Sequence, residues 1–376
     1  MKIESKQTIC VHEGQKPDEY RGINTPIFTS TSYGYLDSEE RLYPRYFNIP
    51  NQQVLIDKLS RLENTESGLI FSSGMAAIST TLMSLLNKED HIIFQHGLYG
   101  GTVNFIKEDF DRFGITYTML TSNDINIIND SIQENTKIIY IETPSNPLLK
   151  IIDLKEISMI CKSKNIISVI DNTFASPINQ NPADFGIDIV IHSATKYLGG
   201  HSDISAGAVL SSRDLINKIM GTSLNFGGSL NAIMCHLLER SLKTLAIRVT
   251  KQNENAQKLA EFLNSNSKVI KVYYPGLPEH NGHETAKKQM AGFGGMLSFE
   301  IKEPNIYDFQ KRLNLIKPSM SLGGVESTIC APSLTSHRHL TKEQKEKDGI
   351  SDNLLRLSVG IEDITDLIKD LERAMK

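Results

Sequence analysis

A short apolar run at residues 187–191 ends in polar residues that suit an anion held beside a reactive amine. The run is rich in β-branched residues, which is typical of a buried strand. Ser193, Thr195 and Lys196 follow it, and two consecutive glycines come soon after. Hydroxyls can donate to phosphate oxygens, and a lysine in a desolvated pocket loses its proton more easily and can form a Schiff base. The alternative is a surface lysine after a strand.

Pyridoxal phosphate combines a phosphate with an aldehyde, and we interpret Lys196 as the residue that carries it. The ring nitrogen of this cofactor must stay protonated if the ring is to accept electrons, which calls for a carboxylate beside it. Asp171 is the candidate, although an acid after a strand can instead cap the next helix. Tyr99 can provide a ring for stacking. The predicted phosphate donors are Ser193, Thr195 and the backbone amides of Gly74 and Met75.

The carboxylate of an amino-acid substrate needs a cation, and the planar fork of an arginine suits it. Arg356 alternates with apolar neighbours in residues 355–359, a pattern that indicates a strand. We predict that Arg356 binds the substrate carboxylate. The alternative is a strand arginine that faces solvent.

The elements that position these residues alternate between strands and helices. Nearly continuous apolar strands separated by helices indicate a parallel sheet that is covered on both faces. Ligands of such sheets bind beyond the carboxyl ends of the strands. The predicted strands lie at 69–71, 91–94, 137–141, 166–170 and 187–191. The candidates that fall just after strand ends are Tyr99, Asn146, Asp171, Ser193, Thr195 and Lys196.

A chain of 376 residues is long enough for two or three domains. Residues 1–45 lack strong periodicity and predict an extended N-terminal arm that contacts a neighbouring subunit, with an ordinary loop as the alternative. Residues 46–235 are predicted to form the cofactor-binding domain. Residues 236–376 are predicted to form a smaller α+β domain that ends in an amphipathic helix.

Composition excludes several classes of function. The chain is 39% hydrophobic and 22% charged, and its net charge of −4 offers no basic surface for nucleic acid. No segment approaches the roughly 18 apolar residues that span a bilayer, and the first residues contain no apolar signal core. The four cysteines are far apart, so we expect neither disulfides nor zinc, and a cytoplasmic protein. We interpret His280, His283, His337 and His339 as parts of loops rather than metal ligands.

Seven segments resemble the sulfur amino acid family of pyridoxal-phosphate enzymes, which includes cystathionine γ-synthases, cystathionine lyases and methionine γ-lyases. The resemblance covers nearly the whole chain and implies the aspartate-aminotransferase fold (fold type I), a mostly parallel α/β sheet covered by helices. The segments are Ser72-Ser-Gly-Met-Ala-Ala, Leu98-Tyr-Gly-Gly-Thr, Glu142-Thr-Pro-Ser-Asn-Pro, Asp171-Asn-Thr-Phe-Ala, Ser193-Ala-Thr-Lys-Tyr-Leu-Gly-Gly-His-Ser-Asp, Ser321-Leu-Gly-Gly-Val-Glu-Ser and Leu355-Arg-Leu-Ser-Val-Gly-Ile-Glu.

The resemblance implies a role for each candidate residue. Lys196 would hold the cofactor and then move protons. Asp171 would pair with the ring nitrogen, and Tyr99 would stack on the ring and assist proton transfer. The implied phosphate ligands are Gly74, Met75, Ser193 and Thr195, and the implied substrate ligands are Asn146, Ser321 and Arg356.

A tyrosine and an arginine from a neighbouring subunit complete the phosphate site in this family. Tyr43 and Arg45 fit that pattern, so the resemblance implies a homotetramer built from two active dimers. The family often reads Tyr-Ser-Arg-x-x-Asn-Pro-Thr, whereas this chain reads Tyr43-Pro-Arg-Tyr-Phe-Asn-Ile-Pro50. We therefore expect the loop after Asn48 to run differently from that of the family.

The activity within the family depends on the far end of the substrate. Members that handle cystathionine often carry acidic residues at the positions of Leu42 and Met320. Apolar residues would leave a charged distal amine unpaired, which favours a substrate such as methionine. Two features depart from the usual pattern: Gly101 stands where methionine γ-lyases carry cysteine, and the loop 331–339 is unusual. We expect a carbon–sulfur lyase that acts by γ-elimination, with cystathionine γ-synthase or O-acylhomoserine sulfhydrylase (γ-replacement) as the alternative.

Two interpretations from other classes are also open. Ser193-Ala-Thr-Lys196 matches the Ser-x-x-Lys motif of penicillin-recognising acyl enzymes, and Ser351-Asp-Asn353 matches their second motif, but no Lys-Thr-Gly follows. The other interpretation is a pyridoxal-phosphate protein that binds or regulates without turnover.

Overall fold

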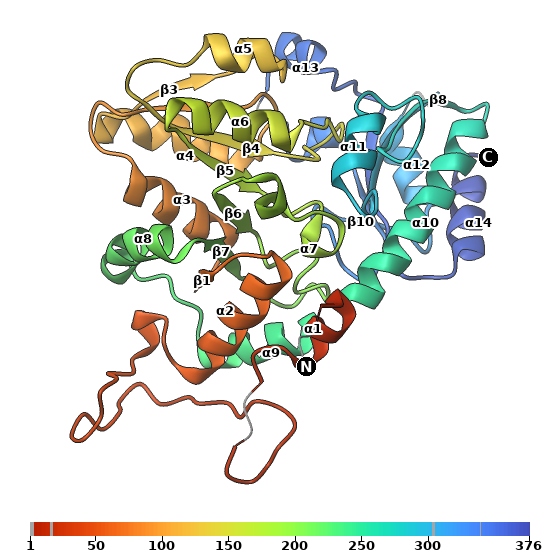
Figure 1. Cartoon of the computed structure of the whole chain (residues 1–376). Helices are drawn as coiled ribbons and strands as arrows, with labels where there is room; N and C mark the ends of the chain where they lie inside the picture. Colours follow the sequence, from red (N-terminus) through yellow and green to blue (C-terminus); the bar gives the residue numbers. More distant parts are fainter. Residues whose placement is uncertain (1–3, 16–17, 303–304, 339) are drawn as a thin grey trace.

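A seven-stranded mixed sheet forms the centre of the larger part of the molecule (Figure 1). The computed structural model describes residues 4–15, 18–302, 305–338 and 340–376. The strand order is β1-β7-β6-β5-β4-β2-β3, and only the β7 pairings within this sheet are antiparallel. The predicted mostly parallel sheet is confirmed. Its strands are β1 (Ser67–Phe71), β2 (His91–Phe94), β3 (Thr116–Met119), β4 (Thr136–Glu142), β5 (Ile167–Asp171), β6 (Ile189–His192) and β7 (Gly207–Ser211).

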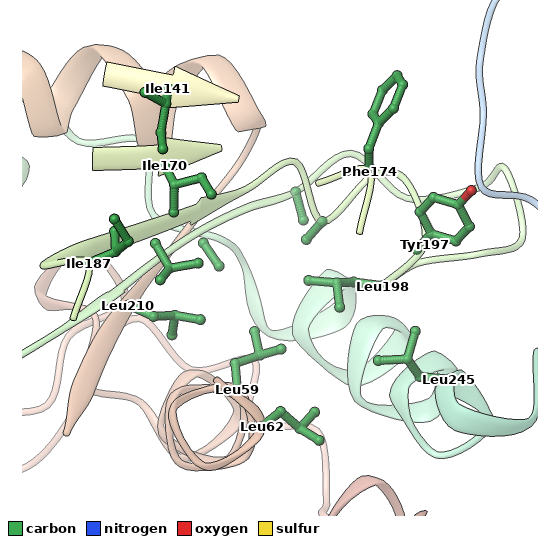
Figure 2. Packing of buried hydrophobic residues seen from close by; sticks show 14 of the residues in the cluster. Leu59, Leu62, Ile141, Ile170, Phe174, Ile187, Tyr197, Leu198, Leu210 and Leu245 are labelled. Atoms are coloured by element: carbon green, nitrogen blue, oxygen red, sulfur yellow. The ribbon is translucent and has the colours of Figure 1, made fainter. Parts of the chain in front are cut away.

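Helices cover both faces of this sheet because successive apolar residues of each buried strand point to opposite sides. In β5, Ile170 joins the core on one face and Val169 joins the core on the other. The first face is covered by α2 (Pro50–Leu62), α6 (Leu154–Lys164) and α9 (Ala232–Leu242). Figure 2 shows Leu59 and Leu62 of α2 beneath the strand residues of this core. The second face is covered by α3 (Gly74–Leu85), α4 (Gly100–Phe113) and α8 (Arg213–Phe226).

A second sheet of five strands, in the order β10-β11-β12-β9-β8, forms the smaller C-terminal part. Helix α10 (Leu245–Ser265) links the two cores, because Leu245 and Val249 pack in the first and Leu259 and Leu263 in the second. The domain limits given above remain a prediction. The strands are β8 (Val269–Tyr273), β9 (Met296–Ile301), β10 (Lys317–Pro318), β11 (Thr328–Cys330) and β12 (Leu354–Ser358). The helices are α11 (His283–Gln289), α12 (Ile306–Arg312), α13 (Lys342–Asp348) and α14 (Ile364–Ala374).

The N-terminal segment contains α1 (Lys6–His12) and, after a long irregular stretch, the 3₁₀ turn η1 (Pro44–Tyr46). Helix α1 packs against α2 and α10, with Ile9 and Cys10 in the core, whereas the irregular stretch extends away from the body of the chain (Figure 1). Tyr20, Ile23 and Leu36 of this stretch are among the most exposed apolar side chains of the described residues. Its contact with a neighbouring subunit remains a prediction. Four further short elements are described: α5 (Ile125–Asp130), α7 (Ser176–Asn179) and the 3₁₀ turns η2 (Pro182–Phe185) and η3 (Pro332–Leu334).

Within the described ranges, none of the helices has the length and apolar character of a membrane span. Cys10, Cys161, Cys235 and Cys330 are all buried and free.

Candidate active site

Lys196 lies in a tight turn directly after β6. Its N–H donates to the carbonyl of Ser193 at 3.1 Å, and its carbonyl accepts from the N–H of Gly200 at 2.7 Å. The amine Nζ donates to Oγ of Ser321 at 3.2 Å, which joins the two parts of the chain. Burial lowers the pKa of Lys196, and the positive charge of Arg356 lowers it further. A larger share of this amine is therefore neutral, as a nucleophile or proton acceptor requires.

Asp171 ends β5 and is buried close to the lysine turn, since β5 and β6 are neighbours. Its Oδ1 accepts the N–H of Thr173 at 3.0 Å. Burial raises the pKa of Asp171, and the hydrogen bonds from Thr173 and the charge of His192 oppose that rise. The cap position of the next helix, α7, is held by Ala175, so the alternative that Asp171 caps this helix is wrong. A cation placed beside this buried carboxylate would favour its ionised form.

The start of α3 offers two backbone donors beside the hydroxyl of Ser193. Ser73 caps this helix, and its Oγ accepts the N–H of Ala76 at 3.0 Å. The N–H groups of Gly74 and Met75 belong to the first turn, which has no intrahelical acceptors and carries the positive end of the helix dipole. A Cβ on Gly74 would lie 2.8 Å from Cβ of Ser193, so only glycine allows this approach. The arrangement suits a phosphate.

Thr195 uses its hydroxyl locally. Its Oγ1 donates to the carbonyl of Ala206 at 3.2 Å and accepts the N–H of the same residue at 3.0 Å. These bonds tie the lysine turn to the start of β7. The predicted phosphate contact of Thr195 requires its hydroxyl hydrogen to leave Ala206.

Arg356 lies on β12 with only 5% of its surface exposed, so the alternative that it faces solvent is wrong. Its Nη1 donates to Oδ1 of Asn146 at 2.8 Å, and its Nη2 donates to the carbonyl of Met320 at 2.9 Å. Within the described part of the chain, Nε is buried and lacks a hydrogen-bond partner. A buried donor without an acceptor is costly, and a ligand carboxylate would satisfy it.

Tyr99 is the cap residue of α4, and 49% of its surface is exposed. Its ring folds over the first turn of that helix, because a Cβ on Gly101 would lie 2.5 Å from Cε1 of the ring. The same Cβ would lie 3.1 Å from Sδ of Met75, so the ring lies near the start of α3. The departure at Gly101 thus has a local reason: a larger residue would displace the ring.

The structure reveals a buried acid that the sequence reasoning missed. Glu142 ends β4, directly beside Asp171 in the register of β4 and β5. Its carboxylate accepts the N–H groups of Tyr99 and Asn146 at 3.0 and 3.3 Å. Burial, with the charge of Asp171, raises the pKa of Glu142 to about 8. Its place at a strand end was the available signal, the same signal that pointed to Asp171.

Tyr43 and Arg45 lie on the η1 turn, in contact with α8. The Arg45 guanidinium donates to the carbonyl of Leu224 and lies 5.6 and 5.3 Å from the ring centres of Tyr43 and Tyr46. Among the described residues, none of these contacts connects Tyr43 or Arg45 with Lys196. That the two residues complete the phosphate site of a neighbouring subunit therefore remains a prediction.

The described ranges contain no group of three or more His, Cys, Asp or Glu side chains that could hold a metal ion. His339 lies outside the described residues.

Comparison with known proteins agrees with the chemistry that these residues indicate. The sequence profile described as Cys/Met metabolism PLP-dependent enzyme matches residues 7–376. The chain belongs to this family. The resemblance noted in the sequence is thereby confirmed, and with it the pyridoxal-phosphate cofactor and the enzymatic nature of the protein. The acyl-enzyme interpretation of Ser193-Ala-Thr-Lys196 is wrong, because these residues belong to a pyridoxal-phosphate enzyme.

Relatives with several activities are similar to this Cys/Met metabolism enzyme over its full length. A cystathionine beta-lyase of Lactococcus lactis subsp. cremoris is 43% identical over 99% of both chains. An L-methionine gamma-lyase of Fusobacterium nucleatum subsp. nucleatum is 38% identical over 100% of this chain and 99% of the relative. A solved cystathionine gamma synthase from Xanthomonas oryzae pv. oryzae, in complex with aminoacrylate and cysteine, superimposes with a TM-score of 0.95 and 35% identity, covering 100% of this chain and 98% of that one. The aspartate-aminotransferase fold type is confirmed by such neighbours.

The residues of this Cys/Met metabolism enzyme fit pyridoxal phosphate. The free amides at the start of α3 and the adjacent Ser193 suit its phosphate, and the desolvated amine of Lys196 suits its aldehyde. The buried carboxylate of Asp171 suits a protonated ring nitrogen. When bound, the cofactor supplies an electron sink that makes the α-proton of an amino acid acidic.

Proposed function

We propose that this enzyme is a carbon–sulfur lyase that acts on a sulfur amino acid by γ-elimination. Methionine or cystathionine, with one water, would yield 2-oxobutanoate, ammonia and a thiol. The observation that supports the choice is the position of Met320. Its carbonyl accepts from Arg356, so it stands next to the predicted carboxylate site, and its apolar side chain is 67% exposed. An apolar side chain at the mouth of the site gives no counter-charge to a distal ammonium group.

The chain's own residues divide the work of this reaction. The guanidinium of Arg356, with Asn146 on its Nη1, binds the substrate carboxylate and orients the α-carbon. The amine of Lys196 would take the α-proton, release it again and, once neutral, take a β-proton, because burial favours its neutral form. The hydroxyl of Tyr99 gives a proton to the departing sulfur. Asp171 keeps the ring nitrogen protonated.

A second candidate is β-cleavage of cystathionine, which would yield pyruvate, ammonia and homocysteine. It is favoured by the identity of 43% to a protein named cystathionine beta-lyase. The γ-replacement alternative is favoured by the structural likeness to a cystathionine gamma synthase. These reactions share the α-proton step and differ in the bond broken and in the acceptor.

The products separate these candidates. The purified holoenzyme would be incubated separately with methionine, cystathionine, cysteine and O-acetylhomoserine, and oxo acids would be resolved by chromatography. We expect 2-oxobutanoate from methionine. Pyruvate from cystathionine as the main product would instead establish β-cleavage, and cystathionine formed from O-acetylhomoserine and cysteine would establish γ-replacement. A protein that yields no product from any of them binds the cofactor without turnover.

A single substitution tests the role of the apolar mouth. Met320→Glu places a carboxylate where a distal ammonium group could reach it. We expect the ratio of kcat/KM for cystathionine to that for methionine to rise about tenfold. An unchanged ratio would remove Met320 from the account of specificity. Met159→Glu, on the exposed surface of α6, is the matched control.

We also propose a cytoplasmic homotetramer made of two active dimers. In each dimer, the N-terminal segment of one subunit contacts the neighbouring subunit. The exposed apolar side chains of that segment support the idea, because Tyr20, Ile23, Tyr35 and Leu36 lie close together in the sequence and a partner subunit would cover the apolar surface that they expose. Light scattering during size-exclusion chromatography would give the mass directly, and a monomer would contradict the proposal.

A further inference from the structure

The main chain of Glu142 is held by two hydrogen bonds to the side chain of Gln95. Its N–H donates to Oε1 of Gln95 at 2.8 Å, and its carbonyl accepts from Nε2 of Gln95 at 2.7 Å. Both residues are buried, with 4% of Glu142 exposed. The amide of Gln95 therefore fixes the end of β4 against the end of β2, and the direction of the Glu142 side chain is set before any ligand binds.

The carboxylate of Glu142 joins two loops that carry predicted site residues. Its Oε2 accepts the N–H of Tyr99 at 3.0 Å, at the start of α4. Its Oε1 accepts the N–H of Asn146 at 3.3 Å, in the loop after β4. The side chain of Asn146 in turn accepts from Arg356 at 2.8 Å. One side chain therefore touches the supports of both the stacking ring and the carboxylate site.

Burial of an acid at this position costs free energy. An acid at this depth loses its hydration, and its neighbour in the register is the acid Asp171. A carboxyl group is nevertheless suited to two N–H donors that approach from different loops, because each of its two oxygens can accept one of them. Asparagine, glutamine or a hydroxyl could not serve both loops in this way.

We propose that Glu142 is a positioning residue for the elimination reaction proposed above. Its two oxygens hold Tyr99 and Asn146 in a fixed relation, so that proton transfer and carboxylate binding depend on the same side chain. The inference rests on the proposed function for its kinetic part. Its binding part concerns amino-acid binding at the cofactor and does not depend on which sulfur amino acid reacts.

Glu142→Gln tests the proposal, because the amide keeps one acceptor oxygen and replaces the other by an NH₂ group that cannot accept. Two quantities would be measured on the holoenzyme: the affinity for alanine, which carries no leaving group, from the change in cofactor absorbance, and the kcat and KM for the substrate found. The apoprotein would be titrated with pyridoxal phosphate as a further measurement.

The matched control is Asp370→Asn in α14. Asp370 is buried, and its carboxylate accepts the N–H groups of Asn314, Leu315 and Ile316 at 2.9 Å, outside the candidate active site. This variant removes comparable hydrogen bonds and reports the effect of lost stability alone.

We expect Glu142→Gln to weaken alanine binding and to lower kcat by about 10- to 100-fold each, which is the usual effect of leaving a buried N–H donor without an acceptor. Asp370→Asn should lower the melting temperature and leave both quantities unchanged. If Glu142→Gln behaves like this control, the proposal is wrong.

Glu142→Asp is the second variant should the first not fold. It is one methylene shorter and can reach only one of the two loops, so the same losses are expected, and normal alanine binding would overturn the proposal. A wild-type protein that binds alanine but turns over no sulfur amino acid would refute the proposed function and leave the binding measurement valid.

Discussion

Asp171→Asn should have opposite effects on the apoprotein and the holoenzyme. The substitution preserves shape, and the remaining amide oxygen can still accept the N–H of Thr173, which Oδ1 now accepts at 3.0 Å. What changes is the charge. In the apoprotein, burial raises the pKa of Asp171 above its value of 3.8 in the unfolded chain. The native state therefore loses stability as pH rises above 3.8, because ionisation of the buried acid is disfavoured.

The effect of Asp171→Asn becomes unfavourable when the cofactor binds. A protonated ring nitrogen beside Asp171 would form a buried charge pair, and removal of one partner of such a pair typically costs about 3–5 kcal/mol. With 1.4 kcal/mol for each factor of ten, this corresponds to roughly 100- to 4,000-fold in cofactor affinity. We expect the lower end, because asparagine still offers the ring nitrogen an oxygen dipole.

Two measurements check this prediction at pH 7. Thermal unfolding of the apoproteins should show a melting temperature for Asp171→Asn that is equal to or above that of the wild type. Titration with pyridoxal phosphate should show the weaker binding. Asp188→Asn is the control, because Asp188 lies at the opposite end of the same strands and accepts from Ser168 at 2.8 Å. Unchanged cofactor affinity, or a less stable apoprotein with Asp171→Asn than with Asp188→Asn, would refute the reasoning.

Three further predictions concern other residues. Gly101→Cys should lower kcat about tenfold, because its Cβ would lie 2.5 Å from the Tyr99 ring and displace it; normal steady-state kinetics would show that the ring adapts. Burial and a neighbouring arginine lower the pKa of His337 to about 4, so folding stability should fall as pH drops from 6.5 to 4. Urea titrations at several pH values would give the free energy of unfolding, and His337→Asn should remove up to about 3 kcal/mol of its decrease between pH 6.5 and 4. An equal pH dependence in wild type and variant would contradict this account. Lys196→Ala and Arg45→Ala should each be inactive, yet a refolded mixture should regain activity if Arg45 serves the neighbouring subunit; absence of recovery would place it in its own subunit's site.

Strand ends were the part of the site that the sequence could predict. In a parallel sheet, the carboxyl ends of strands meet at one edge, so residues after separate apolar runs come together without knowledge of the contacts. Asp171 at the end of β5 and Lys196 after β6 follow this rule, and the two strands are neighbours. The direction of β7 could not be predicted in this way, because an apolar run carries no information on the direction of its partner.

Other features depended on tertiary contacts. The edge strand β3 was missed because its residues are partly exposed and polar residues alternate with larger ones, which gives no apolar run. Arg356 had two equal interpretations until its bonds to Asn146 and Met320 were known. Glu142 had the same position in its strand as Asp171, but its importance lies in two backbone donors from distant loops. Such bonds leave no trace in composition or periodicity.

The pairing of β1 with β7 has a consequence for synthesis of the chain. β1 ends at residue 71, whereas its partner β7 begins at residue 207 and also pairs with β6. On a ribosome, β7 emerges after β1 by roughly 140 residues, or about 7–30 s at 5–20 residues per second. Until then, the start of α3 cannot be held against Ser193, which follows β6. During this interval the nascent chain therefore has no assembled phosphate site. Pyridoxal phosphate can be held at this site only after translation has passed residue 211.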